Sequence, residues 1–580
     1  MFIGIGTPIP LLSSLPGPSR PGAGSAATGE TKFVIEVEIN NLDASGDRDF
    51  TFYSQGSSPN YNIDWGDGSS DSAITANSKS HTYAANGVYD IKIDGTFGVA
   101  MNSALLVDRK KITKLKNWGT NEAQLLSLYR GFESCSNMTY EATDYPDLTN
   151  LDSSSNNKKL YRLFFECDGL TAVDLSNWQN TDNITSLSQM FQATDNVTSI
   201  NITGWDTSNV TTFASMFSSA GFVSQNLVIT APDLDVTGAA SGLNNMFQLS
   251  RCASIDVSGW TFNAGANYDL YRMFYKIWVP TVDLSTWTNC KVSRAKEMFR
   301  DVENLTTINI TGLDFTPNTD LQRFVSNADV LTTFTGISGL VSTNNTDCLG
   351  CFQGLKVYDW SNENLSASFN SGFGNTDDMS SMFNSVGFTT PTPPPNIASL
   401  DTSAVTTMNQ CFINTKFTST LDLSGWDMSA NTNLYRFLNN NDGITSIDAS
   451  SWGFTNALTT MKDMLKGSEV TDITFGSGSD FSGITNFQEF CKDCNNLTSI
   501  DFPTNADFSS VTNMTNFMSS SKSNMSTAEY DNFLVRFNAT NSNSGMTLGF
   551  GKCKYTIATA GTAHAAILAR GNTIIDDGGI

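Results

Sequence analysis

The sequence predicts a mainly β protein with short helices, built as a small β-sandwich followed by a long β-solenoid. Residues 31–98 alternate apolar and polar residues in short runs, which is typical of strands with one buried face. From residue 128 onward a phrase recurs about every 27 residues, as in SINITGW at 199–205 and TLDLSGW at 420–426. With 580 residues the chain is too long for one compact core, whereas a repeat array can extend along one axis.

The first segment, residues 1–30, is rich in Pro and Gly and is predicted to be an extended anchor that docks on a partner. It differs from a signal peptide because no basic residue precedes Arg20, and Pro8 and Pro10 interrupt its apolar run. A flexible tail is the alternative. The candidate docking residues are Phe2, Ile3, Ile5, Ile9, Leu11 and Leu12. The remaining segments are the sandwich at 31–98, a lead-in and N-terminal cap at 99–127, the solenoid at 128–524 and a C-terminal cap at 525–580.

Motifs within 31–98 resemble the polycystic-kidney-disease (PKD) type of β-sandwich. They are WGDG at 65–68, HTY at 81–83, and Gly87 and Tyr89 before the last strand. This resemblance implies a role in spacing and in carbohydrate or protein contact, not in catalysis. Asp64 and Asp67 are candidates to bind a cation, although an Asp-Gly pair is usually only a turn.

Each repeat predicts one coil of the solenoid. Alternate apolar residues such as Ile200 and Ile202 predict a short strand with two inward side chains. The segment DTSNVT predicts a turn and a helix cap, and TTFASMF predicts a short helical return whose last Phe enters the core. Because one coil cannot bury both its strand and its return, coils must stack and the array needs caps.

The phrases DLSNW, GWDTSNVT, MFSSA and GWDMS resemble the BspA-type leucine-rich repeats of bacterial surface proteins and bacteriophage genomes. The segments KNWGT at 116–120 and STAEYDNFLVRF at 526–537 resemble the lead-in and closing cap of those proteins. The resemblance covers residues 31–580 and weakens at 331–400, where PTPPPN interrupts a coil. It implies adhesion and identifies no ligand.

The middle residue of each strand is predicted to face outward, and it is usually Asp or Asn between Ser or Thr. This polar strip is a candidate binding surface for cations or sugars, and its members are Asp174, Asn201, Asp256, Asp283, Asn309, Asp422, Asp448 and Asp501. Neighbouring strands lie about 4.8 Å apart, so carboxylates stacked on each other need hydroxyls, water or a cation between them. A solvated ladder satisfied by its own hydroxyls is the alternative.

The recurring Trp residues and the Cys residues are predicted to pack in the core and not to bind a ligand. A Trp that recurs once per coil is expected to pack coils together, and these residues are Trp178, Trp205, Trp260, Trp287, Trp426 and Trp452. The ten Cys include C-x-x-C pairs at 348–351 and 491–494, which lie five coils apart, about 24 Å at strand spacing, and cannot share a zinc ion. Free thiols in the core are expected, and they suit assembly in a reducing cytoplasm.

Composition argues against several functions. A formal net charge of −24 repels nucleic acid and anionic membranes, and no run of about 20 apolar residues predicts a membrane span. The only histidines are His81 and His564, which excludes most Ser-His and Cys-His nucleophiles and His-rich metal sites. No P-loop, nucleophile elbow or H-E-x-x-H motif is present. We expect no enzyme activity, cofactor or metal, although 57 Asp and Glu leave open an acid pair for glycoside hydrolysis.

These observations favour a virion structural protein of a bacteriophage, either a fibre, a spike or a head decoration, that mediates adhesion to the host surface. The expected partners are other virion proteins through residues 1–30 and a host glycan or protein through the solenoid. Homo-oligomers are left open. The alternative is an extracellular adhesin on a bacterial cell surface, which would need an export signal that we do not find in the sequence.

Overall fold

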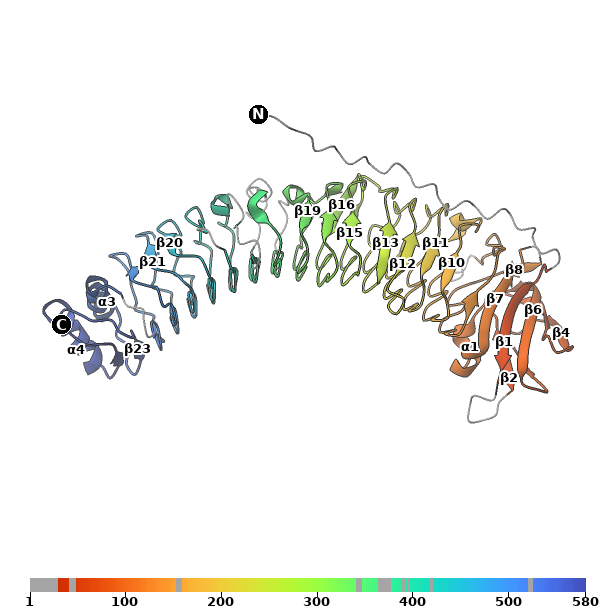
Figure 1. The fold of residues 1–580 in the computed structure, drawn as a ribbon, viewed down its shortest axis with the longest axis horizontal. Coiled ribbons are helices and arrows are strands. Elements are labelled where there is room, and N and C mark those ends of the chain that lie inside the picture. Colours follow the sequence, from red (N-terminus) through yellow and green to blue (C-terminus); the bar gives the residue numbers. More distant parts are fainter. Residues whose placement is uncertain are drawn as a thin grey trace, which may run out of the picture.

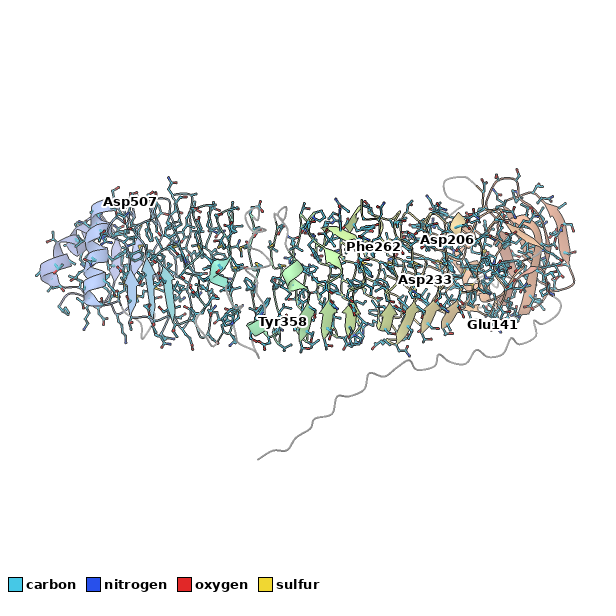
Figure 2. All side chains as sticks on the ribbon, turned by 90° about the horizontal axis from the view of Figure 1, so that it is seen from above. Glu141, Asp206, Asp233, Phe262, Tyr358 and Asp507 are labelled. Atoms are coloured by element: carbon cyan, nitrogen blue, oxygen red, sulfur yellow. The ribbon has the colours of Figure 1, made fainter. Side chains whose placement is uncertain are left out.

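The chain forms an elongated, curved molecule in a computed structural model, with a group of strands at one end and two helices at the other (Figures 1 and 2). The structure describes residues 30–40, 48–120, 122–152, 159–340, 347–362, 377–387, 393, 397–417, 421–519 and 525–580. The predicted mainly β solenoid is confirmed. None of the helices in these ranges has the length and apolar content that a membrane span requires.

Two sheets share one core at the N-terminal end. The strands are β1 (Phe33–Ile39), β2 (Asp49–Tyr53), β3 (Asn60–Asp64), β4 (Ser70–Ile74), β5 (Ser78–Thr82), β6 (Gly87–Phe97), β7 (Ile112–Trp118), β8 (Ala123–Leu125) and β9 (Thr139–Tyr140). The larger sheet has the order β4-β3-β6-β1-β7-β9 with β8 beside β6, and β2 pairs with β5. The Phe52 ring on β2 contacts Tyr61 and Phe97 of the larger sheet, with centroids 6.0 and 5.9 Å away. Because β7 and β8 extend this sheet, the lead-in at 99–127 shares the core of residues 31–98.

The residues of the WGDG and HTY motifs meet in one cluster. The rings of Trp65 and His81 stack with centroids 4.9 Å apart, and the Tyr83 hydroxyl donates to the Trp65 carbonyl at 3.0 Å. The Trp65 indole donates to the Asp71 carboxylate at 3.0 Å, and His81 Nε2 lies 2.8 Å from Asp67 Oδ2. The motif therefore joins the β3–β4 turn to β5.

Parallel strands of successive coils line one side of the solenoid (Figure 2). They form the sheets β10-β11-β12-β13, β15-β17-β19 and β20-β21-β22, while β14-β16-β18 lies on a second side of the coils. The bounds are β10 (Ala172–Asp174), β11 (Ser199–Asn201), β12 (Leu227–Thr230), β13 (Cys252–Asp256), β14 (Asn267–Asp269), β15 (Thr281–Asp283), β16 (Cys290–Arg294), β17 (Thr307–Asn309), β18 (Leu313–Asp314), β19 (Thr333–Thr335), β20 (Ser446–Ala449), β21 (Asp472–Phe475) and β22 (Ser499–Asp501).

The returns of the coils are hydrogen-bonded turns, so the prediction of short helices at segments such as TTFASMF is wrong. Alternate residues donate to the next coil, as Ser215 and Phe217 do to the carbonyls of Asn244 and Met246 at 3.1 and 2.9 Å. The residues between them, such as Met216, donate three residues back within their own coil. Left-handed residues four apart, with φ of 56° at Ser215 and 59° at Ser219, make this alternation possible. We call this side of the coils the turn side.

Aromatic columns fill the core, as the recurrence of Phe and Trp predicted. The rings of Phe217 and Phe247 stack with centroids 5.4 Å apart, and those of Trp260 and Trp287 with centroids 5.0 Å apart. The indole of Trp287 also donates to the Val257 carbonyl of the preceding coil at 2.9 Å. Trp287 therefore packs on the preceding coil and also satisfies one of its carbonyls, which confirms the structural role of this residue.

Helices and one small sheet cap the C-terminal end. The elements are α3 (Thr527–Thr540), β23 (Thr547–Gly549), α4 (Ile557–Ala569) and β24 (Thr573–Ile575), and β23 pairs with β24 in parallel. A capping box begins α3, since the Ser526 hydroxyl accepts from the Glu529 amide and the Glu529 carboxylate accepts from the Ser526 amide. Among the described residues there are also the helix α1 (Leu106–Lys111) and the short 3₁₀ segments Met101–Ser103, Thr181–Asn183, Ile337–Gly339, Trp360–Asn362 and Ile397–Ser399.

Candidate functional site

The polar strip lies on the side of the solenoid that is lined by the parallel strands, here called the strand side. It is built from short turns in which a side chain accepts a backbone hydrogen bond. In seven of its members one side-chain oxygen accepts the amide two residues further on, at 2.9–3.1 Å; they are Asp174, Asn201, Asp256, Asp283, Asn309, Asp422 and Asp448. Asp501 has no such donor because Pro503 follows it. In these seven members one side-chain oxygen is therefore engaged within its own coil, which leaves a second carboxylate oxygen at each Asp and an amide group at each Asn.

Register separates the carboxylates within each sheet. Asp174 pairs with Asn201, which pairs in turn with Thr230 before Asp256 is reached. In the same way Thr474 stands between Asp448 and Asp501. Neutral side chains thus keep like charges apart. Asp256 and Asp283 have no such residue between them, since they come from consecutive coils, and the same holds for Asp422 and Asp448.

The strand ladder is interrupted between those two coils. In several coils a Thr precedes the strand, and its amide and hydroxyl donate to a carbonyl of the coil before, as Thr198 does to Thr171 at 2.7 and 2.6 Å. Leu227 holds this position in β12 and still pairs with β13. Ala253 and Pro280 occupy this position in β13 and β15. Ala253 forms a bulge against β12, and Pro280 has no amide hydrogen to donate. In the described part of the chain, residues 253–257 and 279–283 exchange no backbone hydrogen bond.

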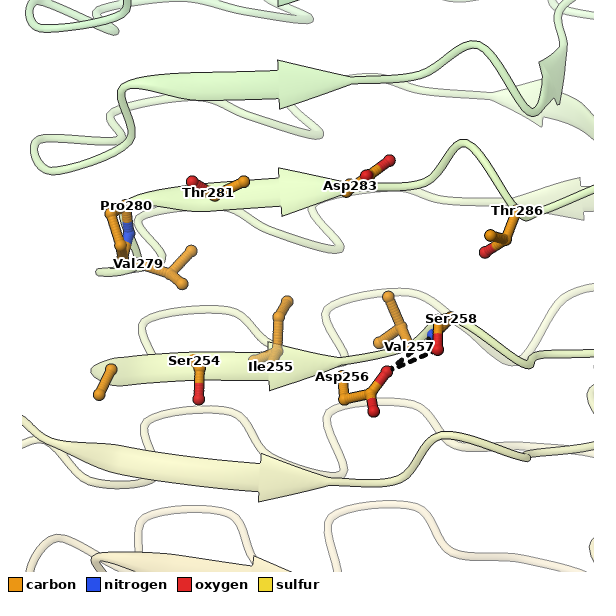
Figure 3. A pocket seen from close by; sticks show the side chains of 11 residues that line it. Ser254, Ile255, Asp256, Val257, Ser258, Val279, Pro280, Thr281, Asp283 and Thr286 are labelled. Atoms are coloured by element: carbon orange, nitrogen blue, oxygen red, sulfur yellow. Dashed lines mark hydrogen bonds between the residues drawn. The ribbon is translucent and has the colours of Figure 1, made fainter. Parts of the chain in front are cut away.

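A cleft of about 310 Å³ occupies the interruption, and β13 and β15 flank it (Figure 3). It is lined by Ala253, Ser254, Ile255, Asp256, Val257, Ser258, Val279, Pro280, Thr281, Asp283 and Thr286. The Ser258 amide and hydroxyl both donate to Asp256 Oδ1, at 3.1 and 2.8 Å. Apolar side chains with carboxylates and hydroxyls around them suit a polyhydroxyl ligand such as a sugar. The available sequence signal was Ala253 and Pro280, at a position that is Thr in several other coils. The sequence analysis missed it.

The two candidate cation ligands outside the strip, Asp64 and Asp67, already accept hydrogen bonds from neighbouring residues. Asp67 accepts hydrogen bonds from Ser69, and these together with His81 lower its pKa to about 2. Asp64 accepts the Gly66 amide at 3.0 Å. Within the described ranges, no group of three or more His, Cys, Asp or Glu has the arrangement of a metal site.

All ten Cys are buried free thiols, as predicted. Burial raises their pKa where a shift is resolved, to about 12 at Cys252 and about 11 at Cys494. A thiol that stays protonated is a poor nucleophile and a poor metal ligand. The six anchor candidates, Phe2, Ile3, Ile5, Ile9, Leu11 and Leu12, lie outside the described residues.

The turn side carries a second group of functional candidates that the sequence analysis missed. A Tyr-Arg pair opens the return in four coils, at 129–130, 161–162, 271–272 and 435–436. Each of these arginines is left-handed, with φ between 51° and 55°. Arg162, Arg272 and Arg436 each lie over the preceding Tyr ring, with 4.9–5.2 Å from guanidinium carbon to ring centroid. The recurring YR dipeptide was the available signal.

Comparison with known proteins gives one family. The family model described as "Mycoplasma protein of unknown function, DUF285" matches residues 127–260, 233–338, 268–389 and 377–502, which together cover more than half of the chain. A solved structure, "Crystal structure of TLR13-ssRNA13 complex", is similar at a TM-score of 0.19 and 10% identity over 83% of this chain. This chain spans 59% of the length of that one. No curated protein sequence matches it.

Proposed function

This chain belongs to the DUF285 family, and on that premise we propose that it is an adhesive, non-enzymatic structural protein of a bacteriophage virion. The family description assigns no function, so the proposal rests on the geometry. The observation that carries it is the strand side, where short polar strands and one open cleft line an elongated solenoid. Such an extended surface suits contact with a large ligand more than it suits turnover of a small one.

Two further features support this proposal. Ten buried free thiols suit a protein that folds in a reducing cytoplasm and is released within a particle. In this proposal the N-terminal sheets are a PKD-like spacer and the coils are BspA-type repeats, and residues 1–30 attach the solenoid to other virion proteins. The strand side then faces the host, where it binds a surface glycan or protein.

A bacterial cell-surface adhesin is the second candidate, favoured by the family description, which refers to Mycoplasma proteins. Immunogold microscopy with antibodies against the purified chain separates the two on native material. We expect gold on phage particles. Labelling of cell envelopes without particles would favour the cell-surface adhesin, and labelling confined to the cytoplasm would contradict both.

The adhesive role is tested with the purified chain on a glycan array, followed by mass spectrometry of the bound glycans. We expect retention of a glycan without any shortened product. The variant Asp256→Asn/Asp283→Asn changes both carboxylates of the cleft and is expected to weaken retention, whereas Asp501→Asn changes a strip residue in a distant coil and serves as the control. A shortened product would show an enzyme, and equal retention by both variants would remove the cleft from the binding site.

A further inference from the structure

We propose that the turn side binds an anionic polysaccharide through a patch centred on Tyr271, Arg272, Tyr275, Arg294 and Arg300, here called the Tyr-Arg patch. It lies on different residues from the strand-side cleft, so it adds a second ligand site to the proposed adhesive role. Its argument does not depend on whether the protein is part of a virion or of a cell surface.

Aromatic rings and guanidinium groups alternate across this patch. The guanidinium carbon of Arg272 lies 5.0 Å from the Tyr271 centroid and 5.1 Å from the Tyr275 centroid. From the next coil, Arg294 covers Tyr271 at 4.5 Å and Arg300 approaches Tyr275 at 5.9 Å. The rings hold the guanidinium planes in fixed positions, which reduces the entropy that a ligand must overcome.

The central carboxylate of the patch, Glu297, lies beneath the arginines that it binds. Glu297 binds Arg272 and Arg300, and its side chain is only 4% exposed. Arg294, which pairs with Asp269, is 40% exposed, and Arg323, which approaches Glu297 at 3.8 Å, is 37% exposed. Burial alone would raise the pKa of Glu297, but the hydrogen bonds from Arg272 and Arg300 lower it below its ordinary value. The buried carboxylate therefore orients the arginines while their outer donors face solvent.

Aromatic and charged side chains continue into the neighbouring coils. Arg251 stacks on Phe222 and Trp278 at 4.7 and 5.3 Å, and a cleft of about 90 Å³ brings these three residues together with Lys276, Asp301 and Glu303. The Phe222 side chain is exposed beside it. Each coil adds about 4.8 Å along the solenoid, so successive basic groups recur at a spacing suited to successive residues of a polymer.

An anionic polysaccharide fits these features together. Sugar rings present apolar C–H faces that pack on Tyr, and their carboxylate or sulfate groups accept paired hydrogen bonds from Arg. The net charge of −24 repels an anionic polysaccharide and a nucleic acid alike at long range, so the choice between them rests on the short-range contacts and is tested with single-stranded DNA. A neutral polysaccharide would leave the guanidinium groups unused.

Biolayer interferometry with the full chain tests this proposal, using polygalacturonate and dextran sulfate as probes and dextran as the neutral control. Arg294→Ala/Arg323→Ala removes two exposed cations and leaves the arginines that hold Glu297 most closely. We expect it to weaken polyanion binding about tenfold. Lys416→Ala removes a similarly exposed cation that pairs with Asp442 far along the solenoid, and it should leave the affinity unchanged. Melting temperatures confirm that both variants are folded.

Binding of polygalacturonate alone or of dextran sulfate alone would support the site and identify which anion it accepts. Equal binding of dextran, equal loss in both variants, or no binding of either polyanion would overturn the proposal. Tighter binding of single-stranded DNA or polyglutamate, lost in the same double variant, would replace the polysaccharide with that class of ligand. The immunogold result is independent of all these outcomes, so failure of the patch leaves the adhesive role open to its own test.

Discussion

Asp256 and Asp283 occupy the same position in consecutive coils, yet no backbone hydrogen bond joins their strands in the described part of the chain. The cleft lies between them, where Ala253 forms a bulge and Pro280 has no amide hydrogen to donate. A bulge at Ala253 and a proline at 280 in consecutive coils thus leave a cleft between two of the parallel sheets (Figure 3).

Replacing Pro280 with Thr restores an amide hydrogen and a hydroxyl at the interruption. We expect slower hydrogen–deuterium exchange in residues 279–283, because the new donors can reach the coil before. The opposite change, Thr306→Pro, removes an amide that donates to the Pro280 carbonyl at 2.9 Å and should speed exchange in β17. Unchanged exchange in both variants would show that the residues at positions 280 and 306 do not determine the hydrogen bonding between neighbouring strands.

Trp287 is expected to be a major source of stability. Its ring is fully buried, stacks on Trp260 and donates to the Val257 carbonyl. Trp287→Ala should lower the free energy of unfolding by about 3–5 kcal/mol, and Trp287→Phe by less because it keeps most of the buried area. Urea denaturation measures both. An equal loss in the two variants would assign the effect to the indole hydrogen bond instead of to packing.

Glycines at the coil corners allow close approach of neighbouring backbones. A Cβ added at Gly476 would lie 1.8 Å from the Ser450 carbonyl oxygen, whereas one added at Gly478 meets nothing within 4 Å. We expect Gly476→Ala to cost about 2 kcal/mol or more and Gly478→Ala less than about 0.5 kcal/mol. Thermal or urea unfolding of the pair checks this, and similar values for the two would contradict the close approach.

The Asp67 carboxylate should make stability depend on pH in the acid range. Ser69 and His81 lower its pKa from 3.8 to about 2, so its contribution is fully present above pH 3.8 and is lost as the pH falls toward 2. Asp67→Asn should therefore cost about 1 kcal/mol at pH 6 and little at pH 2. Urea titrations at both values measure the difference between the proteins, and a difference that persists at pH 2 would rule out this origin.

The thiols should be unreactive in the folded chain. All ten are buried, and burial raises their pKa where a shift is resolved, as at Cys494 and Cys252. We expect no reaction with Ellman's reagent at pH 8 under native conditions and ten equivalents in denaturant. Rapid native labelling of even one thiol would identify an opened coil, and peptide mapping would locate it.

Much of the fold follows from local pattern. The recurring phrase with Ile200 and Ile202, the Phe column and the Trp column predicted stacked coils with an aromatic core, because a residue repeated once per coil must meet its own copies. The returns were predicted less well. Residues such as Ser215 have no strong intrinsic preference for a positive φ, so their sequence does not predict a left-handed turn. Hydrogen bonds to the next coil stabilise that conformation.

The sequence by itself determined that coils stack, which side chains enter the core, and that the strands carry an outward strip of Asp and Asn. Those properties depend on periodicity, and periodicity can be read along the chain. Only the tertiary structure decided where the ladder opens and which charges gather. The Asp256–Asp283 cleft and the arginines around Glu297 bring together residues from different coils, and their register and burial are set by packing between coils.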